Sequence, residues 1–373
     1  MIKVLNVISD SNIGGAGRVL INYLRYANTD EFDTYFAVPK GSLLVNPLTE
    51  LGGKVIEVEG LEDRSYSKED VKTLIKVISE IKPDIVHTHG ALSGRIAAKR
   101  CGSRIIYTRH SAFPVPAKLK YPPGRWINKI VNEHYADHII AVSPAARDNL
   151  TEAGISPKLI TTMMNGVAPV ERCSENIACC EKEKLGITKD DFVMTLLARI
   201  EEYKGHGIIV EAAKIIKASG KQFKIIFAGK GSFEEKLRTL IQEAGLENEI
   251  VFTGFVKDVA PILSISDLQL NASFGTETSS LSILEGFSMG LPAVVSSYGG
   301  NPYLVDEGVN GCIFENRNSK ALAEVLLNLM DDREKLSSMG AEAKRIYTER
   351  FSGEVFAKNI EDVYRKTVKG ARK

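Results

Sequence analysis

Short apolar stretches rich in Val and Ile alternate along the chain with segments of helical period. This alternation predicts parallel sheets built from β-α-β units. Helices are expected between the strands, including residues 18–27 and 68–81, where apolar side chains recur on one face. Because the strands are apolar nearly throughout, both faces of each sheet should be covered. In the first half, strands are expected at residues 3–9, 34–38, 54–58, 85–88, 104–108 and 138–142.

The pattern pauses in a polar, charged stretch at 168–190, and a second series of strands follows. We therefore expect an α/β protein with two doubly wound, Rossmann-like domains that face each other across a cleft. The predicted parts are a first domain at 1–167, a connection at 168–190, a second domain at 191–350 and a helix at 351–373 that returns to the first domain. The second series has strands at 192–197, 224–227, 250–253, 268–271 and 293–295, and helices at 319–331, 333–350 and 353–368.

Composition narrows the function classes. A chain of 373 residues with 44% hydrophobic content is long enough for two cores. The net charge of +1 is far from the strongly basic charge that is typical of a protein that binds duplex nucleic acid. The amino terminus enters a strand pattern directly, without signal-peptide features, and no apolar run has the length of a membrane span, so a cytoplasmic location is expected. The five cysteines show no CxxC spacing and are expected to be reduced thiols.

Two carboxylates, Glu277 and Glu285, flank the start of a predicted helix. The helix follows a strand, so the backbone amides of Ser280 and Leu281 should point from the carboxyl edge of a sheet toward a bound anion. Amides suit phosphates and carboxylates suit hydroxyls, so a nucleotide diphosphate attached to a sugar matches both features. The alternative is that Glu277 only favours a helix amino end and that Glu285 is solvated.

A glycine-rich loop at 14–17 stands between the first strand and its helix. Its backbone near Gly15 and Ala16 can approach a ligand, and phosphate binding is the natural hypothesis. The loop does not match the dinucleotide fingerprint, because Leu20 stands where a third small residue is expected. A simple tight turn is the alternative.

Basic and imidazole side chains follow other strands. Arg199 and Lys204 come after the first strand of the second series and can neutralise a diphosphate, although a basic pair on a loop is more often solvated surface. His89 and His110 stand at the carboxyl ends of strands, where ligands bind in α/β sheets, whereas His87 is at least as well explained by packing. No DxD triplet and no third metal ligand accompany them, so no metal is expected.

Together these motifs resemble the retaining glycosyltransferases of family four, which have the two-domain GT-B architecture. The resemblance runs through nearly the whole chain, and the order and spacing of the motifs are more specific than any one of them. The matching motifs are GGAGR at 14–18, DIVHTHG at 84–90, TRH at 108–110, NGV at 165–167, ARIEEYKG at 198–205, FAGKG at 227–231, FTGFVKDV at 252–259 and the paired glutamates that lead into EGFSMGLPAVVSS.

The resemblance implies a role for each candidate residue. Arg199 and Lys204 would bind the donor diphosphate, Glu285 the ribose, and Glu277 and His110 the transferred sugar, so the implied catalytic residues are His110, Arg199, Lys204 and Glu277. The chain departs from the family at 278–281, which keeps the backbone donors but narrows the room around the sugar. It also departs at 302–303, which puts substrate specificity in doubt more than activity. The implied donor-binding set is Gly15, Ala16, Arg199, Lys204, Gly229, Phe255, Val256, Ser280, Leu281 and Glu285, with the backbone near Phe255 and Val256 at the base.

The implied reaction moves a sugar from a UDP-sugar or GDP-sugar to a hydroxyl of a sugar or lipid-linked acceptor, with retention and without a metal or other cofactor. Synthesis of bacterial cell-surface polysaccharide or glycolipid is the expected setting. The alternatives are a sugar-nucleotide epimerase of the same fold and a noncatalytic sugar-binding protein; a glycan phosphorylase is disfavoured because no lysine context indicates a pyridoxal Schiff base.

Residues 113–129 combine four cations with Phe113, Tyr121 and Trp126 in a proline-broken segment. Aromatic rings and basic side chains suit an anionic membrane surface or a lipid-linked phosphate. This composition predicts peripheral contact with the inner face of the cell membrane. The alternative is a solvated loop that covers the acceptor site, since prolines interrupt a long amphipathic helix.

Overall fold

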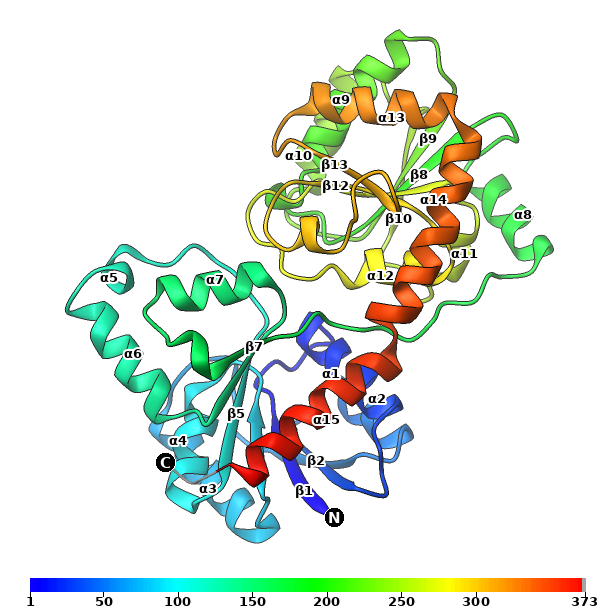
Figure 1. The fold of residues 1–373 in the computed structure, drawn as a ribbon. Helices are drawn as coiled ribbons and strands as arrows, with labels where there is room; N and C mark the ends of the chain where they lie inside the picture. The colour runs from blue at the N-terminus through cyan, green and yellow to red at the C-terminus, as the bar shows by residue number, and fades with distance from the viewer. Residues whose placement is uncertain (371–373) are drawn as a thin grey trace. The chain divides into compact units, whose positions relative to one another are not determined.

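The computed structural model describes residues 1–370, which form two compact units. Unit 1 comprises residues 1–167 and the segment that begins at Gly353, and unit 2 comprises residues 168–352. Each unit is an α/β domain around one parallel sheet, of seven strands in unit 1 and six in unit 2, which confirms the predicted fold class (Figure 1).

Unit 1 has the strand order β3-β2-β1-β4-β5-β6-β7, with every neighbouring pair parallel. The last strand was not predicted, because its three half-buried residues carry too short a pattern to distinguish it from a loop. The strands are β1 (Ile2–Val7), β2 (Phe32–Pro39), β3 (Lys54–Val58), β4 (Ile85–Thr88), β5 (Arg104–Arg109), β6 (His138–Ala141) and β7 (Ile160–Thr162).

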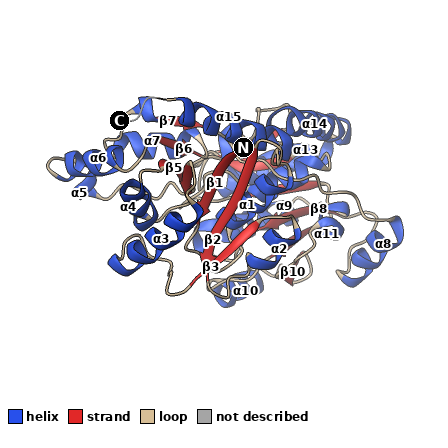
Figure 2. Ribbon diagram, turned by 90° about the horizontal axis from the view of Figure 1, so that it is seen from below, coloured by secondary structure: helices blue, strands red, loops and turns tan. Residues whose placement is uncertain are grey.

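Helices cover both faces of this sheet, as the apolar strands predicted (Figure 2). Leu5 and Val7 of β1 pack with α3 and α4 on one face, whereas Phe36 and Val38 of β2 pack with α1 and α2 on the other. The helices of unit 1 are α1 (Gly15–Arg25), α2 (Val45–Glu50), α3 (Lys68–Ile81), α4 (Leu92–Cys101), α5 (Ala117–Lys120), α6 (Gly124–His134), α7 (Pro144–Glu152) and α15 (Gly353–Lys369).

The helix α15 belongs to unit 1 although it follows unit 2 in the sequence. The ring of Tyr364 lies edge-on to Tyr23 at 6.0 Å between centroids, and its hydroxyl is 2.8 Å from His87 Nδ1. Arg365 donates to both carboxylate oxygens of Glu31, at 2.8 and 2.6 Å. A buried aromatic ring and a bidentate ion pair thus attach α15 to α1, to β4 and to the residue before β2.

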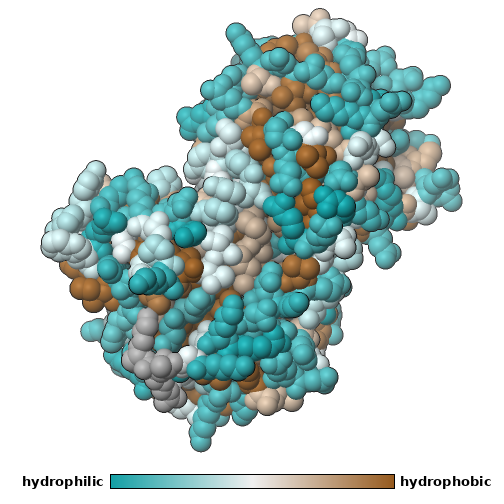
Figure 3. Space-filling model, viewed as in Figure 1, coloured by the Kyte–Doolittle hydropathy of each residue, from teal (hydrophilic) through white to brown (hydrophobic). Residues whose placement is uncertain are grey.

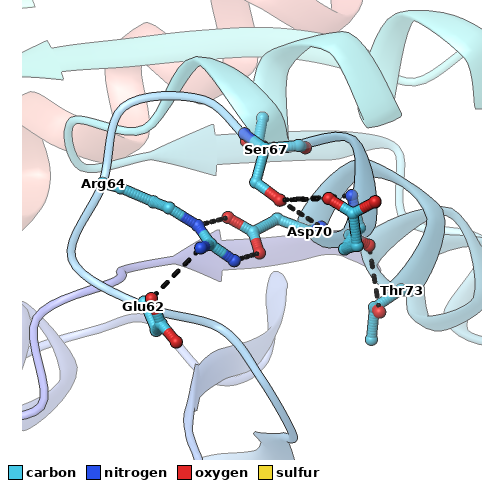
Figure 4. A network of polar contacts seen from close by, with 7 residues as sticks. Glu62, Arg64, Ser67, Asp70 and Thr73 are labelled. Carbon is cyan, nitrogen blue, oxygen red and sulfur yellow. Dashed lines mark hydrogen bonds and ion pairs between the residues drawn. The ribbon is translucent and has the colours of Figure 1, made fainter.

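The loop between β3 and α3 is held by a polar network (Figure 4). Arg64 donates to both carboxylate oxygens of the buried Asp70, at 3.2 and 2.9 Å. Ser67 is the N-cap of α3, and its hydroxyl accepts from the amides of Glu69 and Asp70. The carbonyl of Ser65 accepts from the first two amides of α4, so this loop also satisfies the amino end of a neighbouring helix. The loop is therefore fixed beside the carboxyl edge of the sheet.

Unit 2 has the strand order β10-β9-β8-β11-β12-β13, again with every neighbouring pair parallel. Its core lies between the sheet and the α9, α10 and α13 helices, with Phe192, Phe227 and Phe314 fully buried. The strands are β8 (Phe192–Leu197), β9 (Phe223–Ala228), β10 (Ile250–Gly254), β11 (Leu268–Asn271), β12 (Ala293–Ser296) and β13 (Gly311–Phe314).

Residues 168–190, which were predicted as a connection, contribute α8 to unit 2. Ala178, Leu185 and Ile187 pack in one cluster with Ile262 of α11. The helix expected at 333–350 ends at Ile346 and continues as a π-helical turn, Tyr347–Phe351. The helices of unit 2 are α8 (Glu175–Lys184), α9 (His206–Ala218), α10 (Glu234–Glu243), α11 (Ala260–Ser264), α12 (Leu281–Ser288), α13 (Ser319–Asp331) and α14 (Arg333–Ile346).

Candidate active site

Lys204 and Glu277 meet at the carboxyl edge of the unit 2 sheet. Lys204 ends a short 3₁₀ turn after β8, and Glu277 follows β11, the strand next to β8. Lys204 Nζ lies 2.9 Å from Glu277 Oε2, and both side chains are largely buried. The structure thus brings together two side chains that the sequence singled out for separate reasons.

Neutral polar side chains hold the same carboxylate oxygen. Glu277 Oε2 accepts from Asn271 Nδ2 at 3.2 Å and from Ser273 Oγ at 3.0 Å. The buried Asn301 donates to Asn271 Oδ1 at 3.3 Å and to Ser296 Oγ at 3.1 Å. These four residues were missed, because Asn and Ser at strand ends have no spacing that separates them from ordinary turn residues.

The environment of Glu277 keeps it ionised. Burial alone would raise the pKa of this carboxyl group, but the charge and hydrogen bond of Lys204 and the hydrogen bonds from Asn271 and Ser273 outweigh burial, so the pKa lies below its ordinary value. Glu277 is therefore an ion-paired, hydrogen-bonded acceptor. Such a group can receive hydrogen bonds from ligand hydroxyls at its other oxygen.

Glycines allow the backbone to close around Glu277. Gly205 has φ +79°, and a Cβ there would lie 2.0 Å from the carbonyl oxygen of Ala272. Gly300 donates its amide to the carbonyl of Glu277 at 3.0 Å, and a Cβ on Gly300 would lie 1.5 Å from the carbonyl oxygen of Thr278. These contacts explain why loops after three different strands can meet at one carboxylate.

The amino end of α12 lies directly after this carboxylate. Ser280 is its N-cap, with no side-chain cap, so the amides of the first turn are donors without an intrahelical partner. The Ser279 hydroxyl is buried and has no hydrogen-bond partner among residues 1–370. Glu285 is half-buried in the second turn of α12. Ser280, Leu281 and Glu285 therefore share one short helix beside the Lys204–Glu277 pair.

The other donor-side candidates are more dispersed. Arg199 lies on the loop after β8, and its Nη2 donates to Tyr203 Oη at 2.9 Å. Packing explains the glycine at position 229, because a Cβ there would lie 1.9 Å from the carbonyl oxygen of Ala198. Phe255 is exposed, whereas Val256 packs against the cluster that contains Ile262. The donor roles of these four residues, like those of the other predicted site residues, stay predictions.

In unit 1, the three histidines that the sequence singled out, His87, His89 and His110, lie close together at the ends of β4 and β5. His89 Nδ1 is 2.9 Å from His110 Nε2, and His89 Nε2 is 3.2 Å from Asn6 Oδ1. His87 is fully buried between the Tyr364 and Thr108 hydroxyls, so packing accounts for it. Asn6 was not predicted, because an asparagine inside a strand gives no signal of its neighbours in the sheet.

These imidazoles are uncharged near neutral pH. Burial lowers the pKa of His110 to about 4 and, with the nearby His110 and His138, that of His87 to about 3. Burial and then His87 and His110 hold the pKa of His89 well below its ordinary value. A neutral His110 can exchange hydrogen bonds with a polar ligand but does not carry a positive charge.

The glycine-rich loop begins α1. Gly14 is the N-cap, and no side chain caps the helix. A Cβ on Gly15 would meet nothing within 4 Å, whereas one on Gly17 would lie 2.8 Å from Leu44 Cδ2. Packing therefore explains the glycine at position 17 and leaves open space beside Gly15, whereas Ala16 packs against the cluster that contains Leu20.

No group of three or more His, Cys, Asp or Glu side chains among the described residues is placed to hold a metal ion. No helix among residues 1–370 has the length and apolarity needed to cross a membrane.

Comparison with known families matches both units. The Glycosyltransferase Family 4 model matches residues 13–171, and the model of the group 1 glycosyl transferases matches residues 180–346. The two matches lie on either side of the short segment at 172–179.

Similar proteins extend over most of the chain. The alpha-monoglucosyldiacylglycerol synthase of Acholeplasma laidlawii is 29% identical over 322 residues, covering 79% of this chain and 78% of that protein. The UDP-Gal:alpha-D-GlcNAc-diphosphoundecaprenol alpha-1,3-galactosyltransferase of Escherichia coli is 27% identical over 357 residues, covering 89% of each. The crystal structure of Anabaena Alr3699/HepE in complex with UDP-glucose superposes with a TM-score of 0.83 at 20% identity, covering 98% of this chain and 100% of that one.

Proposed function

The chain belongs to the group 1, family 4 glycosyltransferases, and on that premise we propose that it moves a hexose from a UDP-sugar or GDP-sugar to a hydroxyl acceptor during synthesis of a cell-surface polysaccharide or glycolipid. Membership makes it a glycosyltransferase that uses a nucleotide sugar, in a family whose members are retaining and metal-independent. The donor base, the transferred sugar and the acceptor are the proposed part.

The buried Lys204–Glu277 pair is the observation that carries the proposal. Lys204 supplies positive charge where a diphosphate would lie, and Glu277 is an ionised acceptor for sugar hydroxyls. The first-turn amides of α12 add donors for phosphate oxygens. Arg199 reaches the same edge of the sheet from the loop after β8, and Glu285 on α12 is proposed to accept the ribose hydroxyls.

In the proposed reaction, the bond between the anomeric carbon and the diphosphate oxygen breaks, and a bond from that carbon to the acceptor oxygen forms on the same face. The acceptor proton passes to the leaving diphosphate, so no protein nucleophile is needed. Lys204 and Arg199 stabilise the negative charge that grows on the diphosphate as the bond breaks. His110, which is neutral, would contact the sugar through hydrogen bonds rather than charge.

The names of the relatives support particular substrates. The Escherichia coli relative is named for a UDP-galactose donor and a diphosphoundecaprenol-linked acceptor, and the Acholeplasma laidlawii relative for a glycosylated diacylglycerol. The Anabaena protein of the same fold was crystallised with UDP-glucose. We therefore favour a uridine diphosphate donor and a sugar or lipid-linked acceptor for this chain.

A thermal-shift and calorimetric screen against UDP, GDP and their hexoses tests the donor. A ligand at about 100 times its Kd adds about 2.7 kcal/mol of apparent stability by mass action. Glu285→Ala should weaken binding of the selected nucleotide, and Glu247→Ala, outside the site, should leave it unchanged. No stabilisation by any nucleotide, or unchanged affinity in Glu285→Ala, would refute the donor assignment.

Turnover separates the alternatives. Incubation of the selected donor without an acceptor should leave it intact, whereas an epimerase would convert the sugar. With acceptor and excess EDTA, the product should form with the donor's anomeric configuration, as read by proton NMR. Donor binding without turnover on any acceptor would instead favour a sugar-binding protein.

A further inference from the structure

The helix α6 of unit 1 presents its apolar side to solvent. Trp126, Ile127 and Ile130 are 62%, 59% and 67% exposed, and none of the 11 residues of the helix is buried. Trp126 and Ile130 are one helical turn apart, and Ile127 is next to Trp126, so the three share one side of the helix. Figure 3 shows apolar residues over α6 at the left edge of the molecule.

The opposite side of α6 is polar and faces the protein. Asn128 Nδ2 donates to the carbonyl of Ala153 at 2.8 Å, and Asn132 Oδ1 accepts from Arg95 Nη1 at 2.9 Å. At the end of the helix, Glu133 Oε1 adds a further contact and accepts from the amide of Ser156 at 3.0 Å. A surface helix ordinarily buries its apolar stripe and exposes its polar one, so this helix is oriented the other way round.

These inward contacts fix the orientation. Arg95 is buried, its guanidinium lies 4.3 Å from the centroid of the Tyr107 ring, and it links α4, β5 and α6 through Asn132. Turning α6 to bury Trp126 would leave the Arg95 guanidinium and two asparagine amides without these partners. The exposed apolar side is therefore stabilised by the fold.

The charge around the exposed apolar side of α6 favours an anionic partner. Residues 113–130 contain four cations and no acidic residue. Lys120 is paired with Glu152 at 2.7 Å, whereas Lys118 and Lys129 are exposed and have no ion-pair partner within the described chain. A second copy of this surface would bring like charges together, and an anionic surface would not.

We infer that α6 docks unit 1 onto an anionic lipid bilayer. The helix would lie in the plane of the interface with Trp126, Ile127 and Ile130 among the acyl chains, while Lys118 and Lys129 reach the lipid phosphates. Tryptophan favours the interface between acyl chains and lipid head groups, because its ring is apolar and its N–H is polar. The inference does not depend on the proposed donor or reaction.

The chain contains a single tryptophan, Trp126, so its fluorescence reports on this helix alone. With vesicles of phosphatidylglycerol and phosphatidylcholine, the emission of the full chain should shift to the blue and should be quenched by brominated acyl chains. Phosphatidylcholine vesicles, or high salt, should give much weaker changes, because the cations lose their counter-charge.

Two double variants retain Trp126 as the fluorescent reporter. Ile127→Ser with Ile130→Ser removes two apolar groups, and Lys118→Gln with Lys129→Gln removes two charges; each should raise the lipid concentration for half-maximal shift by roughly tenfold or more. Ile177→Ser and Lys189→Gln, at exposed positions of unit 2, are the matched controls and should behave like the parent chain. All variants should keep the parent's melting temperature, because the changed side chains are exposed.

Emission that anionic vesicles leave unchanged would overturn the inference. Equal binding to phosphatidylcholine vesicles would overturn the inference that the partner is anionic. A dimer detected by light scattering without lipid, and lost in Ile127→Ser with Ile130→Ser, would show that a second copy covers α6 instead.

Discussion

Lys204 Nζ lies 2.9 Å from Glu277 Oε2, which joins two loops whose residues are 73 positions apart in the sequence. Neither residue is independent of the other. Removing the lysine leaves a buried carboxylate with the neutral donors Asn271 and Ser273, and removing the carboxylate takes from a largely buried ammonium group its ion-pair partner.

Lys204→Ala should therefore reduce turnover by roughly 10²-fold or more, because the variant loses charge that stabilises the leaving diphosphate. Initial rates at saturating donor measure the effect. Lys214→Ala is the control, since Lys214 forms an exposed ion pair with Glu211 on α9. Near-parental turnover in Lys204→Ala would remove Lys204 from the catalytic machinery.

Glu277 also predicts a pH dependence of stability. Its folded pKa lies below its ordinary value of 4.5, so its contribution is fully present above about pH 4.5 and is lost as the pH falls through the folded pKa. The melting temperature of unit 2 in the parent chain should exceed that in Glu277→Gln by a constant amount at pH 6 to 8, and by less below pH 4.5. A difference that grows on acidification would contradict the sign.

Gly205 and Gly220 form a matched pair for testing the loop that carries Lys204. Both have a left-handed backbone, with φ of +79° and +78°, but a Cβ on Gly205 would lie 2.0 Å from the Ala272 carbonyl oxygen, while one on Gly220 would meet nothing within 4 Å. Gly205→Ala should lower turnover by roughly tenfold or more by displacing Lys204, and Gly220→Ala should cost only about 1 kcal/mol of stability. Equal effects of the two substitutions would show that the close approach to Ala272 is unimportant.

His87 and His110 of unit 1 should not titrate near neutral pH. Because burial lowers the pKa of His87 to about 3 and that of His110 to about 4, their ring proton resonances should stay constant from pH 5.5 to 8. Spectra of the parent chain, with assignment by His87→Gln and His110→Gln, provide the measurement. A resonance of either residue that moves with a midpoint near pH 6.5 would show that its ring is hydrated and can be charged.

Much of the fold could be predicted from the sequence, because it depends on the local pattern of apolar and polar residues. The strands Ile85–Thr88 and Leu268–Asn271 were predicted with the bounds that the structure gives, since a short apolar stretch between turn residues needs little else to identify it. The short strands β7 and β13 were not predicted, because each is recognisable only from its pairing with a strand elsewhere in the chain. The α8 helix was missed for a similar reason: its apolar residues are few, and packing against α11 stabilises it.

The sequence by itself determined the alternation of strands and helices, because hydrophobic period is a property of the residues themselves. It also determined that Lys204 and Glu277 are candidates for the site, because their charge does not depend on the fold. Only the tertiary structure decided that Asn271, Ser273 and Asn301 support Glu277, since neutral polar residues acquire a role from what surrounds them. It also decided which side of α6 faces solvent. Composition placed tryptophan and lysine together there, but the hydrogen bonds of Asn128 and Asn132 to distant segments turn the apolar side outward.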